Sequence, residues 1–194
     1  MPNRSEVPVV YWDTSLFISF LTGRDADKQA AVSLILNDLL TSNPPFIASL
    51  SHFTRAELRT YAADDAKQRE VIDRLFLGLV PGPNIRYFPV DRRIGDLASQ
   101  IGSEFQQITP PDAIHIATAL AAGAKCLWTF DGIRRDGSRR SGHLASFDGK
   151  IHGLEICAPD SWKLMPLFEE TGAPRLESAS TLKTSTPQSS NAEG

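Results

Sequence analysis

Hydrophobic residues along the chain fall into short runs rich in β-formers, which alternate with longer runs of helical periodicity. The short runs predict strands at residues 8–12, 45–50, 85–90, 125–130 and 154–158. The longer runs predict helices at residues 15–22, 25–41, 51–66, 67–79, 91–107 and 110–122. Strands separated by helical crossovers pair in parallel and are covered by helices on both faces. The pattern therefore predicts an α/β fold: a three-layer α/β/α sandwich with a central parallel sheet of about five strands.

Length and composition indicate one folded domain followed by a tail. The chain has 194 residues, of which 41% are hydrophobic and 22% are charged, and this balance is typical of a globular protein. We expect the domain to occupy residues 1–170. Residues 171–194 are rich in Ser, Thr and Pro and poor in large apolar side chains. Such a segment cannot offset the entropy lost on ordering, so we expect a disordered tail.

The sequence gives no sign of export or membrane insertion. The N-terminal segment MPNRSEV is polar and lacks the apolar core of a signal peptide, and no run reaches the roughly 18 apolar residues of a membrane span. We therefore expect a cytoplasmic protein. Cys126 and Cys157 lie in apolar contexts and are expected to be reduced core residues. The net charge of −3 argues against a protein that coats nucleic acid by bulk electrostatics.

Four acidic residues stand where a parallel sheet places its ligand sites, near the carboxyl ends of strands. Asp13 ends the first predicted strand, and Asp131 ends the fourth. Glu57 lies two turns into the helix after the second strand, and Asp112 lies in the first turn of the helix before the fourth. Carboxylates gathered at one sheet edge would repel each other unless a cation lay between them. Hard oxygen ligands with few histidines nearby suit Mg²⁺ or Mn²⁺ rather than zinc.

Each acid also has a local structural explanation. Thr54-x-x-Glu57 matches a capping box, and Thr109-x-x-Asp112 places an acid where the helix dipole favours it. Asp13 alone would serve as a helix N-cap, and the fourth acid alone would be a turn residue before a glycine. The combination favours a metal site over four separate structural roles.

The acids lie in four ordered segments between residues 8 and 131: VVYWDTSLFISFL, SHFTRAELR, PPDAIHIATAL and LWTFD. These segments resemble the motifs of PIN-domain ribonucleases, and in particular those of the VapC-like toxins of type II toxin–antitoxin systems. The resemblance implies a PIN-like fold and a divalent-metal-dependent endoribonuclease. Such an enzyme hydrolyses RNA phosphodiester bonds and leaves a 3′-hydroxyl and a 5′-phosphate.

The resemblance also implies the residues and partners of the site. The implied catalytic and metal-binding acids are Asp13, Glu57, Asp112 and Asp131, of which the fourth varies most in such enzymes. The implied pocket hydroxyls are Thr14, Ser15 and Thr129. The cofactor would be Mg²⁺ or Mn²⁺, in one or two ions. The implied partners are an RNA substrate, a cognate antitoxin protein and a second copy of the chain, with no membrane.

The remaining candidates are less specific. His115 is close to a motif, but a helical histidine beside an acid can simply hydrogen-bond it, so we expect a structural or partly exposed residue. Trp12, Phe53 and Trp128 could stack on RNA bases or could equally lie in the core. The apolar segments LFISFLTG and AAVSLILNDLL could form an antitoxin groove or a dimer face, or could cover the sheet; we favour core for most of their side chains.

Residues 132–153 form a basic, glycine-rich segment that a compact VapC-like protein would not need. The segment has five basic and two acidic residues in a chain of net negative charge, and its glycines are expected to make it flexible. Its candidate RNA-binding residues are Arg134, Arg135, Arg139 and Arg140. Arginines beside a phosphate-cleaving pocket could hold an RNA backbone. The alternative is a solvated surface insertion.

Other functions are compatible with parts of this pattern. A PIN nuclease of RNA processing would share every motif with a toxin. A binding module that has lost cleavage would be expected to lose at least one acid, whereas all four are present. A Rossmann-type nucleotide binder would need a glycine-rich turn after the first strand, and WDTSLF has none.

Overall fold

The computed structural model describes residues 7–62, 65–79, 82–134 and 138–159. The predicted tail, residues 171–194, lies outside these ranges, as does Arg135.

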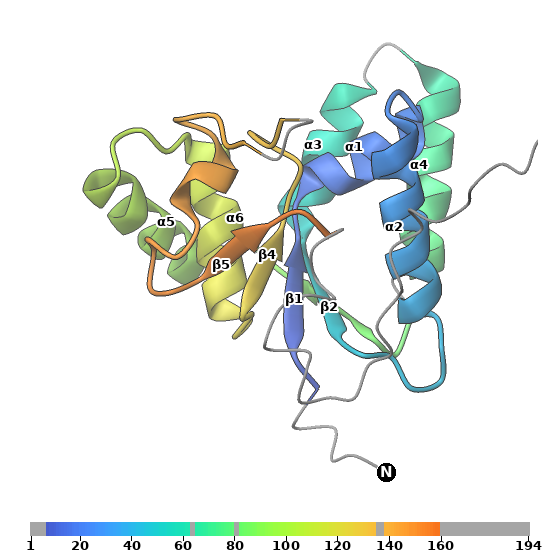
Figure 1. Cartoon of the computed structure of the whole chain (residues 1–194), viewed down its shortest axis with the longest axis horizontal. Coiled ribbons are helices and arrows are strands. Elements are labelled where there is room, and N and C mark those ends of the chain that lie inside the picture. Colours follow the sequence, from blue (N-terminus) through green and yellow to red (C-terminus); the bar gives the residue numbers. More distant parts are fainter. Residues whose placement is uncertain (1–6, 63–64, 80–81, 135–137, 160–194) are drawn as a thin grey trace, which may run out of the picture.

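A sheet of five parallel strands crosses the middle of the molecule (Figure 1). In spatial order, the strands are β3 (Ile85–Phe88), β2 (Ile47–Ser51), β1 (Val9–Trp12), β4 (Cys126–Trp128) and β5 (Glu155–Cys157). Each neighbouring pair is parallel. The predicted parallel sheet is confirmed, and its central strand, β1, leads directly into Asp13.

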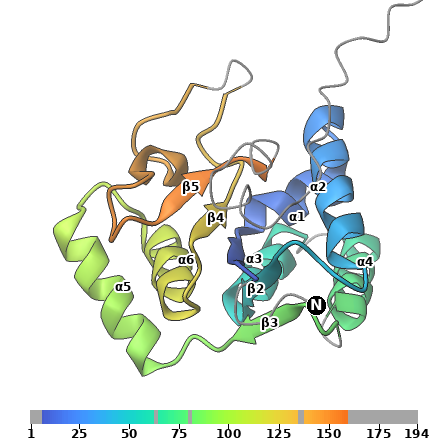
Figure 2. The ribbon, with the colours of Figure 1, turned by 60° about the horizontal axis from the view of Figure 1, so that its bottom comes forward.

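Helices cover both faces of the sheet (Figure 1, Figure 2). One side carries α1 (Thr14–Thr22), α2 (Ala26–Leu39), α3 (His52–Tyr61) and α4 (Ala66–Leu79), and the other carries α5 (Arg92–Glu104) and α6 (Pro110–Ala121). The three-layer arrangement is therefore confirmed. Within the described residues, none of the helices is long and apolar enough to cross a membrane.

Helices α3 and α4 are separated by a cap that the hydrophobic pattern did not reveal. The predicted helix over residues 51–66 is too long, because α3 ends at Tyr61. Asp65 Oδ1 accepts hydrogen bonds from the backbone N–H groups of Lys67 and Gln68, at 2.9 and 3.0 Å. A carboxylate that satisfies the free N–H groups of a first turn favours a new helix start at that point.

Alternate residues of the central strands contribute to two separate hydrophobic cores. Val10 and Trp12 of β1 and Trp128 of β4 belong to the core under α1–α4, whereas Tyr11 and Leu127 belong to the core under α5 and α6. Successive side chains of a strand point to opposite faces, so a strand buried on both faces contributes to both cores. This alternation places the Tyr11 ring on the same side of the sheet as α6.

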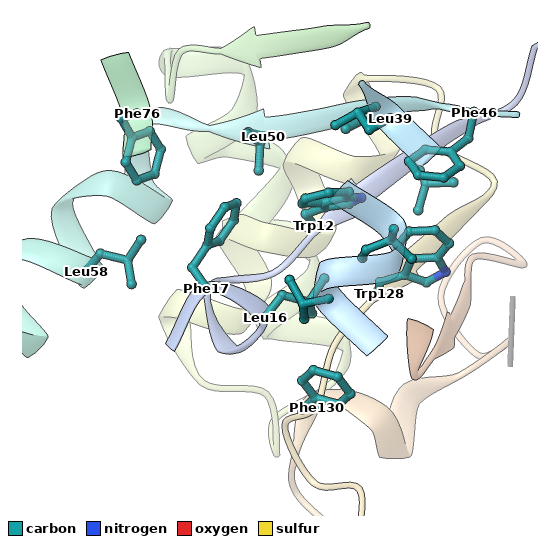
Figure 3. Packing of buried hydrophobic residues seen from close by; sticks show 14 of the residues in the cluster. Trp12, Leu16, Phe17, Leu39, Phe46, Leu50, Leu58, Phe76, Trp128 and Phe130 are labelled. Carbon is teal, nitrogen blue, oxygen red and sulfur yellow. The ribbon is translucent and has the colours of Figure 1, made fainter. Parts of the chain in front are cut away.

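Trp12 and Trp128 are core residues rather than platforms for RNA bases. Both are fully buried, and their ring centroids lie 6.1 Å apart in a stacked arrangement. Phe46 packs edge-on against Trp128, with centroids 4.9 Å apart, and Phe17 lies beside Trp12 (Figure 3). The aromatic cluster therefore stabilises the sheet immediately behind the residues that follow β1 and β4.

The described part of residues 132–153 packs against the domain through apolar side chains and exposes Arg134, Arg139 and Arg140. It contains η2 (Leu144–Phe147), a short 3₁₀ helix. Leu144, Phe147 and Ile151 are buried in the core under α5 and α6. These apolar side chains anchor the part of the segment that carries Arg139 and Arg140.

The glycines of this segment were expected to make it flexible, but Gly132 is needed for a tight turn. Its φ angle is +77°, and a Cβ atom at this position would lie 2.4 Å from the Cβ atom of His143. Only glycine combines this backbone conformation with so close an approach. The turn brings His143 beside Asp131, the acid that precedes Gly132.

Cys126 is buried and Cys157 is partly buried. They lie on the neighbouring strands β4 and β5, with their Sγ atoms 3.4 Å apart. The two thiols, separated in the sequence, are thus brought into contact by strand pairing.

Candidate active site

The candidate site lies at the carboxyl ends of β1 and β4, where the chain enters α1 and the turn after Thr129. The Asp13 backbone N–H donates to the carbonyl of Trp128 at 3.0 Å and so joins the ends of the two strands. Helix α6 approaches this edge from the opposite side, and α3 contributes Glu57.

Asp13 is buried, with 5% of its surface exposed, and it is the N-cap of α1. Its Oδ2 atom accepts hydrogen bonds from the Ser15 hydroxyl at 2.6 Å, the Ser15 backbone N–H at 3.2 Å and the Thr129 hydroxyl at 2.8 Å. The other oxygen, Oδ1, lies 3.5 Å from His115 Nε2. The two pocket hydroxyls predicted from the sequence therefore orient this carboxylate through one of its oxygens.

Glu57 is not part of a capping box. The N-cap of α3 is Ser51, so Thr54 lies inside the helix. The Glu57 carboxylate instead reaches across to α1 and α6, where Oε2 accepts hydrogen bonds from the Thr14 hydroxyl at 2.5 Å and from His115 Nε2 at 2.7 Å. Glu57 therefore does not cap its own helix, and its hydrogen bonds are tertiary contacts with α1 and α6.

The ionised form of Glu57 is favoured in this environment. Burial alone would raise the pKa of the carboxyl, but the hydrogen bond and the charge of His115, together with the Thr14 hydrogen bond, lower the pKa below its ordinary value. Glu57 is therefore a carboxylate at neutral pH, available as a charged ligand.

Asp112 hydrogen-bonds to Thr109, the N-cap of α6, and its environment disfavours the ionised carboxylate. The Thr109 hydroxyl donates to its Oδ2 atom at 2.8 Å, and the backbone N–H of Asp112 donates back to the Thr109 hydroxyl at 3.3 Å. Burial raises the pKa of the Asp112 carboxyl, and the negative charges of Asp131 and Asp13 raise it further, against the opposing effects of Thr109 and His115. The structure thus brings three of the predicted acids within electrostatic reach of one another.

Asp131 is directed toward its own loop. Its carboxylate oxygens lie 3.0 and 3.3 Å from His143 Nδ1, and Oδ2 also accepts the Leu144 backbone N–H at 3.0 Å. Its backbone N–H donates to the Thr129 hydroxyl at 2.8 Å. Asp131 therefore ties the end of β4 to the start of η2, a role that would compete with metal binding.

His115 has a larger part in the site than expected. Only 2% of its surface is exposed, so it is not a partly exposed residue. Nε2 contacts Glu57, Nδ1 lies 2.8 Å from the Tyr11 hydroxyl, and the Phe53 ring packs at 5.6 Å between centroids. The available signal was spacing: residues three apart on a helix share a face, which places His115 next to Asp112.

Opposing effects act on the pKa of His115. Burial lowers its pKa, but the hydrogen bond to Glu57 and the negative charges of Asp13, Glu57 and Asp112 raise the pKa above the ordinary value of a histidine overall. The surrounding carboxylates thus favour the protonated form of the His115 ring.

The donor set fits a hard divalent cation in its chemistry. Asp13, Glu57 and Asp112 offer carboxylate oxygens from three separate elements, which is the ligand type that Mg²⁺ and Mn²⁺ prefer. Among the residues that the structure describes, no three His, Cys, Asp or Glu side chains form a group compact enough to hold a metal ion. Mg²⁺ commonly retains several waters and uses only one or two carboxylates, so direct ligation by all four acids is unnecessary.

The predicted RNA-binding arginines differ in their surroundings. Arg134 and Arg140 are exposed on the two arms of a small antiparallel turn. Arg139 Nη1 pairs with Asp148 at 2.7 Å and donates to the Ala145 carbonyl at 3.2 Å. The Arg139 guanidinium is therefore engaged in holding the segment together.

Comparison with known families agrees with the fold and with the order of the acids. The sequence model of the PIN domain matches residues 10–135, which include all four acids. The chain belongs to the PIN-domain family. No curated protein matched the sequence.

Solved structures give the same fold for the PIN domain. FitAcB from Neisseria gonorrhoeae superposes with a TM-score of 0.52 at 21% identity, covering 77% of this chain and 97% of the other. VapC20 of Mycobacterium tuberculosis, a sarcin–ricin loop cleaving toxin, superposes with a TM-score of 0.51 at 17% identity, covering 63% of this chain and 90% of the other. A toxin–antitoxin complex from Klebsiella pneumoniae superposes with a TM-score of 0.50 at 18% identity, covering 77% of this chain and 97% of the other. At such identities the likeness establishes the fold.

Proposed function

We propose that this PIN domain is a divalent-metal-dependent endoribonuclease and the toxin of a toxin–antitoxin pair. The observation that carries the proposal is the convergence of Asp13, Glu57 and Asp112 around the buried His115; these acids come from the N-cap of α1, from α3 and from α6. Burying like charges together is unfavourable, and their retention at one edge of the sheet is what a cation-binding site requires.

The residues of the site have separate tasks in this proposal. Asp13, Glu57 and Asp112 would hold Mg²⁺ or Mn²⁺, and Asp131, the fourth acid, would support the site from outside through its contact with His143. A bound ion would activate water and neutralise the charge that builds on the scissile phosphate. Ser15 and Thr129 hold Asp13, and Thr14 holds Glu57, so the carboxylates are oriented before substrate arrives. The products would carry a 3′-hydroxyl and a 5′-phosphate.

The same comparison supports the proposed substrate and partner. RNA is supported by the sarcin–ricin loop cleaving activity of VapC20 and by the exposed Arg134 and Arg140 close to Asp131. We include Arg135 in this RNA-contacting set and give Arg139 a supporting role through Asp148. A toxin of this kind would act in the cytoplasm and would be held by an antitoxin, as in the Klebsiella complex, and we also expect a homodimer.

The decisive assay is cleavage of an end-labelled mixed RNA pool by the purified chain. We expect cutting with Mg²⁺ or Mn²⁺ that EDTA abolishes, because the carboxylates alone cannot activate water or neutralise the phosphate. An Asp112→Asn preparation purified in the same way exposes contaminating nucleases. Induced expression of the wild-type chain, but not of this variant, should arrest bacterial growth. Equal cutting by the two preparations, or cutting that survives EDTA, would contradict the proposal.

Asp131→Asn should reduce cleavage less than Asp112→Asn does. The Asp131 carboxylate is occupied by His143 and Leu144, and an Asn carbonyl can still accept the Leu144 N–H. We expect a loss of about tenfold in kcat, as for a residue that supports a metal site from outside. Rates for both variants on one RNA, with matched circular dichroism spectra, give the comparison. Equal losses would place Asp131 among the residues that hold the ion.

A further inference from the structure

A buried chain of hydrogen bonds runs from Tyr11 through His115 to Glu57. The Tyr11 hydroxyl lies 2.8 Å from His115 Nδ1, and His115 Nε2 lies 2.7 Å from Glu57 Oε2. Tyr11 is fully buried on β1, and His115 is 2% exposed on α6. The three residues come from three elements on both sides of the sheet edge, so the chain forms only in the folded protein.

The direction of each hydrogen bond follows from the chemistry of Glu57. A carboxylate only accepts hydrogen bonds, so Nε2 must carry the hydrogen that faces Oε2. Nδ1 accepts from the Tyr11 O–H when the ring is neutral and donates to the Tyr11 oxygen when the ring is protonated, so the Tyr11 hydroxyl holds the ring in both states. Burial and the charge of Asp13 raise the pKa of Tyr11 above its ordinary value, so the phenol is protonated at neutral pH.

Both donors to Glu57 contact the same oxygen. The Thr14 hydroxyl and His115 Nε2 both contact Oε2, and these two contacts restrain the orientation of the carboxylate. A histidine ring turns easily about its last torsion. Tyr11 restrains that torsion from the far side of the ring, and Phe53 packs against the ring.

We propose that Tyr11 and His115 are positioning residues for Glu57, with Tyr11 orienting the imidazole so that Nε2–H holds the carboxylate in its metal-binding orientation. This inference rests on the proposed function of the site. It assigns a role to Tyr11, which lies two positions before Asp13 and belongs to the core under α5 and α6. Outer-shell partners of this kind orient ligands without touching the reacting atoms.

Tyr11→Phe tests the inference, because it keeps the ring and removes only the hydroxyl. We expect a roughly tenfold fall in kcat with KM unchanged on a single-stranded RNA oligonucleotide, and a comparable weakening of Mn²⁺ binding measured by calorimetry without RNA. Tyr87→Phe is the matched control, since the buried Tyr87 hydroxyl makes no hydrogen bond to the described residues. It should leave both quantities unchanged.

A second pair of variants guards against misfolding. His115→Gln keeps an N–H donor that can face Glu57. His115→Leu fills the same buried position with an apolar side chain and has no donor. At equal helical content, the Gln variant should bind Mn²⁺ more tightly and cut faster than the Leu variant. A role in packing alone would give the two variants the same values.

The outcomes separate this inference from the proposed function. Wild-type kcat and wild-type Mn²⁺ affinity in Tyr11→Phe would overturn the positioning role, even if the chain is a metal-dependent ribonuclease. If the wild-type chain cuts no RNA, the proposed function fails, and the Mn²⁺ affinities of the Tyr11 and His115 variants still decide whether the chain of hydrogen bonds positions Glu57.

Discussion

Asp112→Asn should lower metal-dependent RNA cleavage by at least about a hundredfold, because one preorganised electrostatic contact to a transition state is commonly worth that much. Asn has the shape of Asp and can keep the Thr109 hydrogen bonds that begin α6. It lacks the charge that would hold the cation. The loss should therefore appear in cleavage and in metal affinity without a loss of fold.

The same substitution should make the metal-free protein more stable at neutral pH. The pKa of Asp112 is raised by burial and by the charges of Asp131 and Asp13, so the folded protein binds this proton more tightly than the unfolded chain does. The ionised carboxylate consequently destabilises the fold above the raised pKa. The advantage of Asn should be present above that pKa and should shrink as the pH falls through it.

Thermal unfolding of both proteins across this pH range, with and without Mn²⁺, checks the argument. Mn²⁺ should raise the Tm of the wild type more than that of the variant, because binding to the folded state stabilises it by mass action. A variant that unfolds at a lower temperature than the wild type at neutral pH would show that the ionised Asp112 carboxylate does not destabilise the fold.

Asp13→Ala should abolish cleavage and also destabilise the fold by about 1–2 kcal/mol, the usual cost of losing a helix N-cap. Asp13 Oδ2 accepts three hydrogen bonds, and Ala would leave the Ser15 and Thr129 hydroxyls without this partner. Asp13→Asn keeps an oxygen that accepts them and loses the charge. It should be inactive and close to wild-type stability.

Urea unfolding of the two Asp13 variants separates structure from catalysis. The Ala variant should have a lower midpoint with an unchanged slope, and the Asn variant should match the wild type. If the Asn variant retained wild-type cleavage, Asp13 would be a cap and nothing more. If the two variants were equally stable, the hydrogen bonds at Oδ2 would have no structural role.

The layout of the sheet was predictable because its signals are local. Short runs of β-formers and the longer helical runs between them indicated the three layers. The predicted ends were less accurate: α3 ends at Tyr61 rather than at residue 66, and Asp65 caps the first turn of the next helix. A single polar side chain at a helix end is a weak signal beside a run of apolar ones.

The acids of the site were found from the sequence, but their environments were not. Glu57 fits a capping box in the sequence and serves none in the structure, where it meets Thr14 and His115. His115 was expected to be structural or partly exposed, and it lies buried between Glu57 and Tyr11. Glu57 and Tyr11 are 58 and 104 positions away from His115, so no local pattern could indicate them.

By itself, the sequence determined the α/β class, the parallel order of elements and the placement of carboxylates at strand ends and helix starts, since periodicity and capping act over about one turn or one pleat. The tertiary structure alone decided that Asp131 binds His143, that Arg139 pairs with Asp148, and that Cys126 meets Cys157. These contacts depend on how strands pair and on how segments fold back onto the sheet. Their geometry is set by the packing of two cores rather than by any one stretch of chain.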